Sequence, residues 1–258
     1  MSDRDFQHYR EVYESLPFEP TLERFRRKQI SKRLAPLVSK NLPHILDVGV
    51  GRSAVSRHLE FPIASLALVE PMKWALDRDE QRFGSDHVTR FHGTYQSFIS
   101  QASAKRKYDV VLFSGVLHEM NEDEAEQAVA STSSILAAGG LVLAVVPNRN
   151  SIHRVLGVHL GLQDSLDSRT QAEVRVSQQN GYTMSTLDGK FASHGFRSVL
   201  TETFFLKLSS HAEMAKAMES KVLTESGLDQ LFALSELLPE HGAEVLGLYR
   251  LHSDESAR

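Results

Sequence analysis

The sequence contains no cysteine among its 258 residues. Disulfide bonds, thiolate metal sites and cysteine nucleophiles are therefore excluded. Histidine could still bind a metal, but no two histidines are spaced i, i+4 with a carboxylate in the zincin order, and we expect no metal site. Internal repeats and low-complexity segments are also lacking. What remains is the composition of an ordinary globular chain, with 41% hydrophobic and 24% charged residues.

Long apolar segments are missing as well. No apolar run approaches the length that spans a bilayer. The N-terminal stretch MSDRDFQHYREVYESLPFEP is polar and has no apolar core of the kind found in signal peptides. We therefore expect a cytoplasmic protein that does not insert into a membrane.

Positive charge does not predominate, because the formal net charge is −4. This balance argues against a protein that works mainly by neutralising nucleic-acid phosphates, and we expect no nucleic-acid partner. The one basic stretch, ERFRRKQISKR, spans Glu23–Arg33. It could bind an anionic partner, but a solvated basic face on a capping helix is the favoured interpretation.

A regular alternation of strands and helices begins near residue 41, after an N-terminal helical segment at residues 1–40. Strands are expected at HILDVG, SLALVE, VTRFHG, YDVVLFSG and LVLAVVPN, and two more at RSVLTETFFLKL and AEVLGLYRL. Almost wholly apolar strands at this spacing are typical of a parallel sheet with helices on both faces. We predict an α/β fold with a doubly wound, Rossmann-like, mostly parallel sheet of seven strands.

Local signals also mark several helices. A helix is expected over residues 54–59. Pro71 is a favoured first helical residue, and Asn121 is a typical N-cap residue. The helix after Asn121 should continue to the AAGG segment near residue 137, which would end it.

Two segments interrupt the alternation. Residues at about 149–181 and 210–238 look helical and are too long for plain connections. We expect them to form a cap over a ligand cleft within a domain spanning residues 41–258; packing or a dimer surface is the alternative. No feature of the sequence indicates the oligomeric state.

The first strand runs into a glycine-rich loop. The segment GVGRSA fits G-x-G-x-x-G/A and Glu70 follows at a suitable distance for a ribose, which alone gives weak support to a dinucleotide dehydrogenase. Asp47, two residues before the first glycine, would however repel a pyrophosphate and could attract a cationic ligand. The Tyr-x-x-x-Lys pair of short-chain dehydrogenases is absent. These features favour a ligand with a cationic end.

Four segments together resemble the motifs of class I S-adenosylmethionine-dependent methyltransferases, across roughly residues 41–208. They are ILDVGVG, LALVEP, YDVVLFSGVLHEM and LAAGGLVLAVVPN. The resemblance implies an enzyme with S-adenosylmethionine as cofactor. It places Asp47 near the methionine ammonium, directly or through water, and Glu70 at the ribose hydroxyls. The alternatives are that Asp47 caps the next helix and that Glu70 favours the dipole of the helix that follows it.

The resemblance also implies the remaining cofactor contacts. The bare backbone of the glycine loop would let the cofactor approach closely, and HGTYQSF occupies the position that lines the adenine, although the family usually has an acidic residue there. These further candidates for cofactor binding are Gly49, Gly51, Thr94, Tyr95, Ser114 and Gly115.

Candidates for catalysis follow the fourth and fifth strands. SGVLHEM places His118 and Glu119 just past the methionine end of the cofactor, and a histidine has a suitable pKa to deprotonate a hydroxyl. PNRNSIHRVLGVHLGL resembles a stretch of bacterial small-molecule and glycan-associated methyltransferases. It makes Asn148, His153 and Arg154 candidates for acceptor contacts, with His153 a second candidate base. The alternative is that these residues stabilise the inserted helix.

The expected reaction is O-methylation of a small metabolite, sugar or glycan hydroxyl. Methyl transfer is an in-line displacement, so the enzyme chiefly aligns donor and acceptor and removes a proton. Methylation of a nitrogen or a carboxylate is the alternative within the same class. A cofactor-binding accessory protein without catalysis is the alternative outside it.

Overall fold

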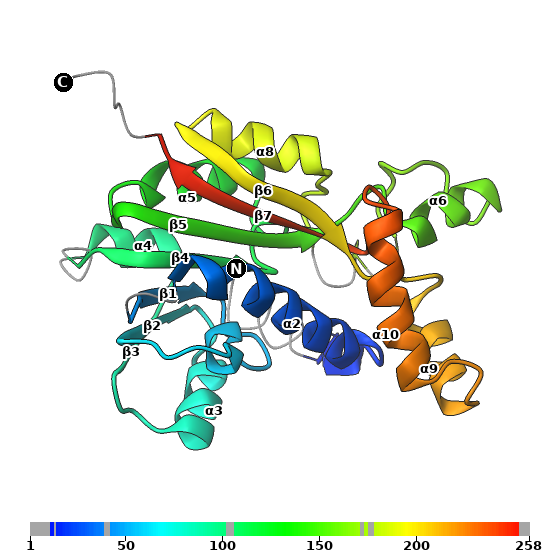
Figure 1. The fold of residues 1–258 in the computed structure, drawn as a ribbon, viewed down its shortest axis with the longest axis horizontal. Helices are drawn as coiled ribbons and strands as arrows, with labels where there is room; N and C mark the ends of the chain where they lie inside the picture. The colour runs from blue at the N-terminus through cyan, green and yellow to red at the C-terminus, as the bar shows by residue number, and fades with distance from the viewer. Residues whose placement is uncertain are drawn as a thin grey trace.

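The computed structural model describes residues 11–252, apart from residue 13 and residues 39–41, 102–105, 171–172 and 175–177. Of the predicted N-terminal segment 1–40, residues 1–10, 13, 39 and 40 lie outside the described residues, as do five residues of the predicted insertion 149–181. A seven-stranded sheet runs through the molecule in the order β3-β2-β1-β4-β5-β7-β6 (Figure 1). β7 is antiparallel to both of its neighbours, and the other pairs are parallel. The predicted α/β fold with a mostly parallel seven-stranded sheet is confirmed.

The strands are β1 (His44–Val48), β2 (Ser65–Glu70), β3 (Val88–His92), β4 (Tyr108–Ser114), β5 (Leu136–Pro147), β6 (Phe196–Phe204) and β7 (Glu244–Leu251). The helices are α2 (Glu19–Val38), α3 (Lys73–Phe83), α4 (Tyr95–Ser100), α5 (Glu122–Thr132), α6 (Ile152–His159), α8 (Met184–Ala192), α9 (His211–Glu219) and α10 (Glu225–Leu234), with 3₁₀ turns η1 (Val55–His58) and η3 (Ser235–Leu237). None of the described helices is long and apolar enough to cross a membrane.

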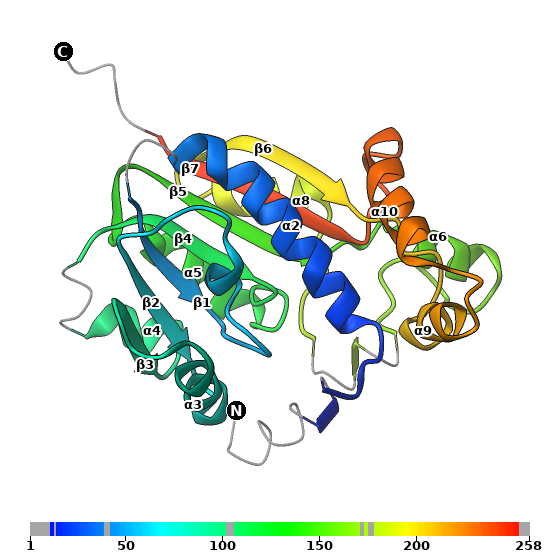
Figure 2. The same cartoon turned by 60° about the horizontal axis from the view of Figure 1, so that its bottom comes forward.

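Helices cover both faces of the sheet, as Figure 2 shows. Successive side chains of a strand point to opposite faces. In β4, Val110 and Leu112 join the core beneath α2 and α3, whereas Val111 and Phe113 join the core beneath α4, α5 and α8. Strands buried on both faces explain the nearly continuous apolar runs of the sequence.

Several element boundaries differ from the predictions. Asn121 is the N-cap of α5 as expected, and it also forms a capping box with Glu124. The prediction for Pro71 is wrong, because the Met72 N–H donates to Glu70 Oε1 at 2.9 Å and α3 begins at Lys73. The predicted helix at 54–59 is only the 3₁₀ turn η1. α5 ends at Thr132. The AAGG segment, which was expected to end this helix, belongs instead to β5, at the point where the register between β5 and β4 shifts.

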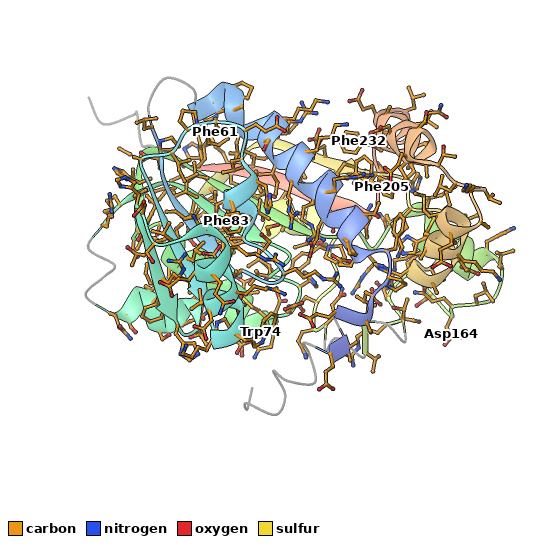
Figure 3. All side chains as sticks on the ribbon, turned by 90° about the horizontal axis from the view of Figure 1, so that it is seen from below. Phe61, Trp74, Phe83, Asp164, Phe205 and Phe232 are labelled. Carbon is orange, nitrogen blue, oxygen red and sulfur yellow. The ribbon has the colours of Figure 1, made fainter. Side chains whose placement is uncertain are left out.

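The basic stretch is not simply a solvated face. Phe25 of α2 packs on Phe205 and on Phe232 of α10, with ring centroids 4.7 and 5.1 Å apart. Figure 3 labels Phe205 and Phe232. The basic side chains beside it pair with α10 and η3 in three ion pairs: Arg24–Glu225, Lys28–Asp229 and Lys32–Glu236. Arg26 is buried. The insertion after β6, which carries α9 and α10, is thereby docked on α2.

Candidate active site

A cavity of about 720 Å³ lies at the carboxyl ends of β1, β2, β4 and β5. The first half of α2 and both insertions complete its walls. Its volume is in the range of pockets that hold small molecules. Every site residue predicted from the sequence lines this cavity except Asp47.

The glycine loop forms the floor of one end. Gly49 has φ +86° and an added Cβ would lie 2.4 Å from Val116 Cγ2, so a side chain is excluded on both counts. Gly51 has φ +51° and faces open space. The loop therefore offers bare backbone to a ligand.

Glu70, at the end of β2, holds this loop in place. Its Oε2 accepts hydrogen bonds from the N–H groups of Val50 (2.7 Å) and Gly51 (3.3 Å). Oε1 accepts from Met72 N–H. Burial raises the pKa of Glu70, and these three backbone donors oppose the shift. A carboxylate oxygen has about two acceptor positions, so Oε2 is fully engaged and Oε1 can still accept one hydrogen bond from a ligand.

Asp47 is fully buried beneath the loop and is not part of the cavity wall. Its Oδ2 accepts from Ser56 N–H at 2.9 Å, which stabilises η1, while Oδ1 has no donor among the described residues. Burial raises the pKa of Asp47 to about 6. The expected direct contact with a ligand ammonium is absent from this geometry. That Asp47 acts on a ligand ammonium through a water molecule or through its charge stays a prediction.

The hydroxyls of the predicted adenine-lining residues are engaged elsewhere. Thr94 Oγ1 accepts from Ser97 N–H and caps α4, and the Tyr95 hydroxyl lies 2.9 Å from Thr132 Oγ1 inside the core. The sequence reasoning missed Met72 and Val116, which also line the cavity near the glycine loop. Apolar residues directly after the ends of β2 and β4 are the signal that could have identified them.

The end of β4 links the two ends of the cavity. Ser114 Oγ is buried and has no hydrogen-bond partner among the described residues. Gly115 has φ +74°, and a Cβ there would lie 3.6 Å from Arg26 Nη1 and 3.9 Å from His118 Cε1. The β4 end thus brings the predicted cofactor residues next to the predicted base.

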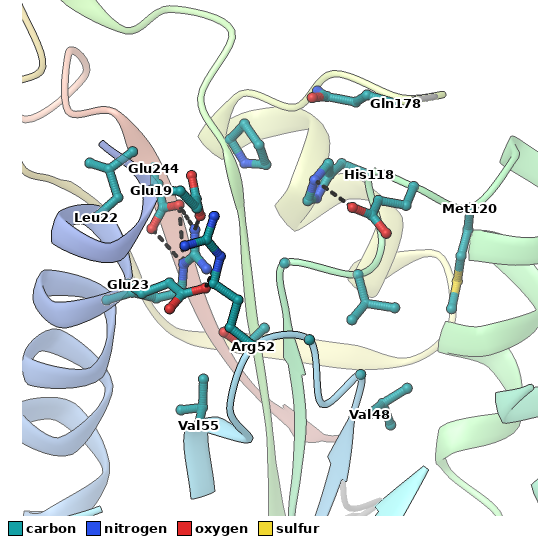
Figure 4. Close-up of a pocket in the computed structure, with 18 of the residues that line it drawn as sticks. Glu19, Leu22, Glu23, Val48, Arg52, Val55, His118, Met120, Gln178 and Glu244 are labelled. Carbon is teal, nitrogen blue, oxygen red and sulfur yellow. Dashed lines mark hydrogen bonds and ion pairs between the residues drawn. The ribbon is translucent and has the colours of Figure 1, made fainter. Parts of the chain in front are cut away.

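His118 is buried in the cavity wall, with Nε2 3.8 Å from Glu119 Oε1 (Figure 4). Burial, reinforced by the charge of Arg26, lowers the pKa of His118 to about 3. The imidazole is therefore neutral at physiological pH. Its Nδ1 is buried without a hydrogen-bond partner among the described residues.

Two of the three predicted acceptor residues are engaged with other groups of the protein. The Asn148 amide donates to the Glu240 and Gly242 carbonyls at 2.8 Å. Arg154 is ion-paired with Glu173, and its Nη2 donates to the carbonyls of Leu166 (2.8 Å) and Ser168 (2.7 Å). His153 differs, since its Nδ1 is buried without a partner among the described residues.

A buried charge network on the opposite wall was not predicted. Arg26 is ion-paired with Glu19 (3.1 Å) and with Glu244, whose two oxygens also accept from Arg26 Nε (Figure 4). Lys207 and His211 line the same part of the cavity. A signal was present for Arg26, because it falls in the apolar stripe that Leu22 and Ile30 mark on α2.

The family model for a methyltransferase domain matches residues 22–201, more than half of the chain. The matched range contains the glycine loop, Glu70 and the end of β4. A search of curated proteins finds no match.

Solved structures share the fold at low identity. The N-methyltransferase NodS from Bradyrhizobium japonicum WM9, in complex with S-adenosyl-L-homocysteine, is 14% identical, and the match covers 95% of this chain and 99% of that one at a TM-score of 0.57. The plantazolicin methyltransferase BamL, in complex with a triazolic desmethylPZN analogue and S-adenosylhomocysteine, is 15% identical, with coverages of 93% and 89% and a TM-score of 0.60. A Burkholderia thailandensis 1,6-didemethyltoxoflavin-N1-methyltransferase is 14% identical, with coverages of 98% and 92% and a TM-score of 0.56.

Proposed function

Because the chain belongs to the methyltransferase domain family and is an S-adenosylmethionine-dependent methyltransferase, we propose that it methylates a hydroxyl of a small molecule, sugar or glycan. The observation that carries this proposal is a neutral imidazole, His118, in the cavity wall between the end of β4 and Glu119. A neutral imidazole beside the cofactor end of the cavity suits the removal of a hydroxyl proton.

The residues at the glycine-loop end fit the cofactor. Gly49 leaves no room for a side chain, Glu70 Oε1 keeps one acceptor position for a ribose hydroxyl, and Ser114 Oγ lacks a partner among the described residues. In this proposal Met72 and Val116 pack against the adenine. When bound, the cofactor supplies the methyl group on a positively charged sulfur, and the protein supplies binding and orientation.

The proposed role of His118 is to accept the acceptor's proton late in the reaction. With a pKa of about 3 it is a weak base, so it does not deprotonate the free hydroxyl. As the methyl group arrives, the oxygen gains positive charge and its proton becomes strongly acidic. Transfer to His118 then becomes favourable, and Glu119 can stabilise the imidazolium that forms.

Methylation of an amine is the second candidate. The NodS and toxoflavin proteins are N-methyltransferases by description, and the carboxylates Glu19, Glu23 and Glu119 line the cavity. Carboxylates attract a protonated amine, although the amine must lose its proton before it can attack. A non-catalytic accessory role is disfavoured, because His118 and Glu119 supply a usable base at the cavity.

A mass-shift screen tests the proposal. The protein is incubated with S-adenosylmethionine carrying a deuterated methyl group and with a panel of hydroxyl and amine compounds, and labelled products are identified by mass spectrometry. We expect O-methylated products. Products labelled only on nitrogen would replace the hydroxyl proposal by the amine candidate.

His118→Asn then tests the base. We expect turnover to fall by about 10²–10⁴-fold, with affinity for S-adenosylhomocysteine nearly unchanged. His252→Asn, at an exposed residue outside the cavity, is the control and should behave as wild type. Normal turnover of His118→Asn together with an inactive Glu119→Gln variant would transfer the role to Glu119.

A further inference from the structure

Lys207, His153 and His211 meet at one corner of the cavity, and we refer to them as the Lys207 corner. Lys207 follows β6 and is 6% exposed. Among the described residues its ammonium has one hydrogen-bond partner, His153 Nε2 at 3.5 Å, and no carboxylate within ion-pair distance. A buried ammonium without a hydrogen-bonded anion is costly and uncommon in proteins.

The nearby carboxylates already have other partners. Glu19 and Glu244 are bound to Arg26, and Glu173 is bound to Arg154 and to Thr170 N–H. They act on Lys207 only at longer range. The ammonium therefore has two N–H donors for which the described residues provide no acceptor.

The other unpartnered groups at this corner can also be donors. An ammonium can only donate, so His153 Nε2 accepts from it and the proton of His153 is on Nδ1. That Nδ1 is buried without a partner among the described residues, as are His211 Nδ1 and Arg154 Nε. All of these unpartnered atoms are nitrogens, and the corner is rich in donors that lack an acceptor.

Two further features agree with a ligand site. Burial lowers the pKa of Lys207 to about 8, with Glu19, Glu173 and Glu244 opposing the shift and Arg154 adding to it. Phe205, two residues before Lys207, has φ +60°, a strained conformation for a residue with a side chain. Strain of this kind concentrates at ligand-binding positions.

We propose that the Lys207 corner binds a carboxylate carried by the methyl acceptor, so that the substrate is a hydroxy acid or another acidic small molecule. This inference rests on the proposed function, since it assigns the acceptor end of that cavity. The methionine part of the cofactor also carries a carboxylate. The test must therefore separate these two sources.

Binding of carboxylates and of their uncharged amides tests the proposal. The full chain, saturated with S-adenosylhomocysteine, is titrated with acetate, succinate and benzoate and with acetamide, succinamide and benzamide, and binding is followed by ligand-observed NMR. We expect at least one carboxylate to bind about tenfold or more tightly than its amide. Lys207→Met should abolish this preference, and Lys216→Met, at an exposed lysine of α9, should preserve it. Lys207→Gln, which retains a neutral donor, serves as a second variant if the first does not fold.

A parallel titration identifies the source of the carboxylate. S-adenosylhomocysteine has the amino-acid carboxylate, and 5′-methylthioadenosine lacks it. If Lys207→Met weakens only S-adenosylhomocysteine, the corner serves the cofactor and the proposal is overturned. It is also overturned if wild type binds no carboxylate in preference to its amide, or if both Lys207 variants keep the preference. A wild-type protein that binds no S-adenosylhomocysteine would instead contradict the proposed function.

Discussion

At the scale of single residues, Asp47 shows how a motif can cost stability. Its carboxylate is fully buried and only one of its oxygens has a hydrogen-bond donor among the described residues. An ionised carboxylate in such a position lowers the free energy of unfolding, because burial disfavours its charge. If it acted only as a helix cap, an uncharged residue would serve as well. The charge itself can act on a cationic ligand across the loop.

Asp47→Asn should expose this cost through its pH dependence. Folding raises the pKa of Asp47 from 3.8 to about 6, so the folded state binds this proton more tightly than the unfolded state does. The stability that the protonated carboxyl contributes is therefore lost as the pH rises from 3.8 through about 6. The unfolding free energy of wild type relative to Asp47→Asn should therefore fall by about 2 kcal/mol between pH 4 and pH 7. Urea unfolding at both pH values measures it. Asp77→Asn, at a half-exposed helix position in an ion pair with Lys73, is the control.

The same variant separates the two roles of Asp47. If the charge attracts the methionine ammonium, calorimetry should show weaker binding of S-adenosylmethionine by Asp47→Asn, even where the variant is the more stable protein. Unchanged affinity would leave Asp47 as a cap of η1.

The sequence predicted those site residues whose positions follow from the backbone. Carboxyl ends of parallel strands meet at one edge of a sheet, so Glu70, Gly115 and His118 line one cavity. Arg26 and Lys207 could not be placed in this way. Arg26 is buried because Glu244, 218 positions away, meets it, and no local pattern specifies such a pairing. The N–H donors of Lys207 that lack an acceptor can be identified only from the side chains that surround the ammonium in the folded protein.

At the scale of elements, α2 joins the sheet, the cavity and the second insertion. Phe25 packs on α10, and Glu19 and Arg26, two turns apart on the same helix, lie at the cavity wall. Strand positions were predictable from apolar runs, because buried strands need them. Helix boundaries that depend on a single hydrogen bond could not be predicted in this way. The start of α3 is an example, because Met72 N–H donates to Glu70 and the helix begins at Lys73.

Arg26→Met should destabilise the protein strongly. Without the guanidinium, Glu19 and Glu244 are two buried carboxylates without an ion-pair partner, and breaking a buried ion pair in this way costs about 3–5 kcal/mol. The loss should be smaller at pH 5 than at pH 7, because protonation relieves the unpaired charge. Urea unfolding at the two pH values tests this. Arg24→Met removes an exposed ion pair and should cost less than about 1 kcal/mol.

A double variant checks the physical cause. Adding Glu244→Gln to Arg26→Met removes one of the two uncompensated charges, so part of the lost stability should return. If the double variant is no more stable than Arg26→Met, lost packing and not buried charge explains the effect.

At the scale of the whole molecule, the cavity lies where the sheet edge, α2 and two insertions meet. The insertions differ in how they are held. α10 is docked on α2 through stacked rings and ion pairs, whereas Leu156 of α6 and Leu160, which follows the helix, are exposed. We therefore expect α6, which carries His153, to respond to the acceptor. We expect the same of α9, because His211 at its start lines the Lys207 corner of the cavity.

Hydrogen exchange should resolve this response in two steps. S-adenosylhomocysteine alone should slow exchange in the glycine loop, because that loop walls the cofactor end of the cavity. Exchange in α6 and α9 should slow only when an acceptor identified by the mass-shift screen is added, since local stability rises where a ligand bridges weakly held segments. α8, on the opposite face of the sheet, is the internal reference and should not change. If α6 and α9 exchange equally with and without acceptor, the insertions serve packing or subunit contact and do not form a cap.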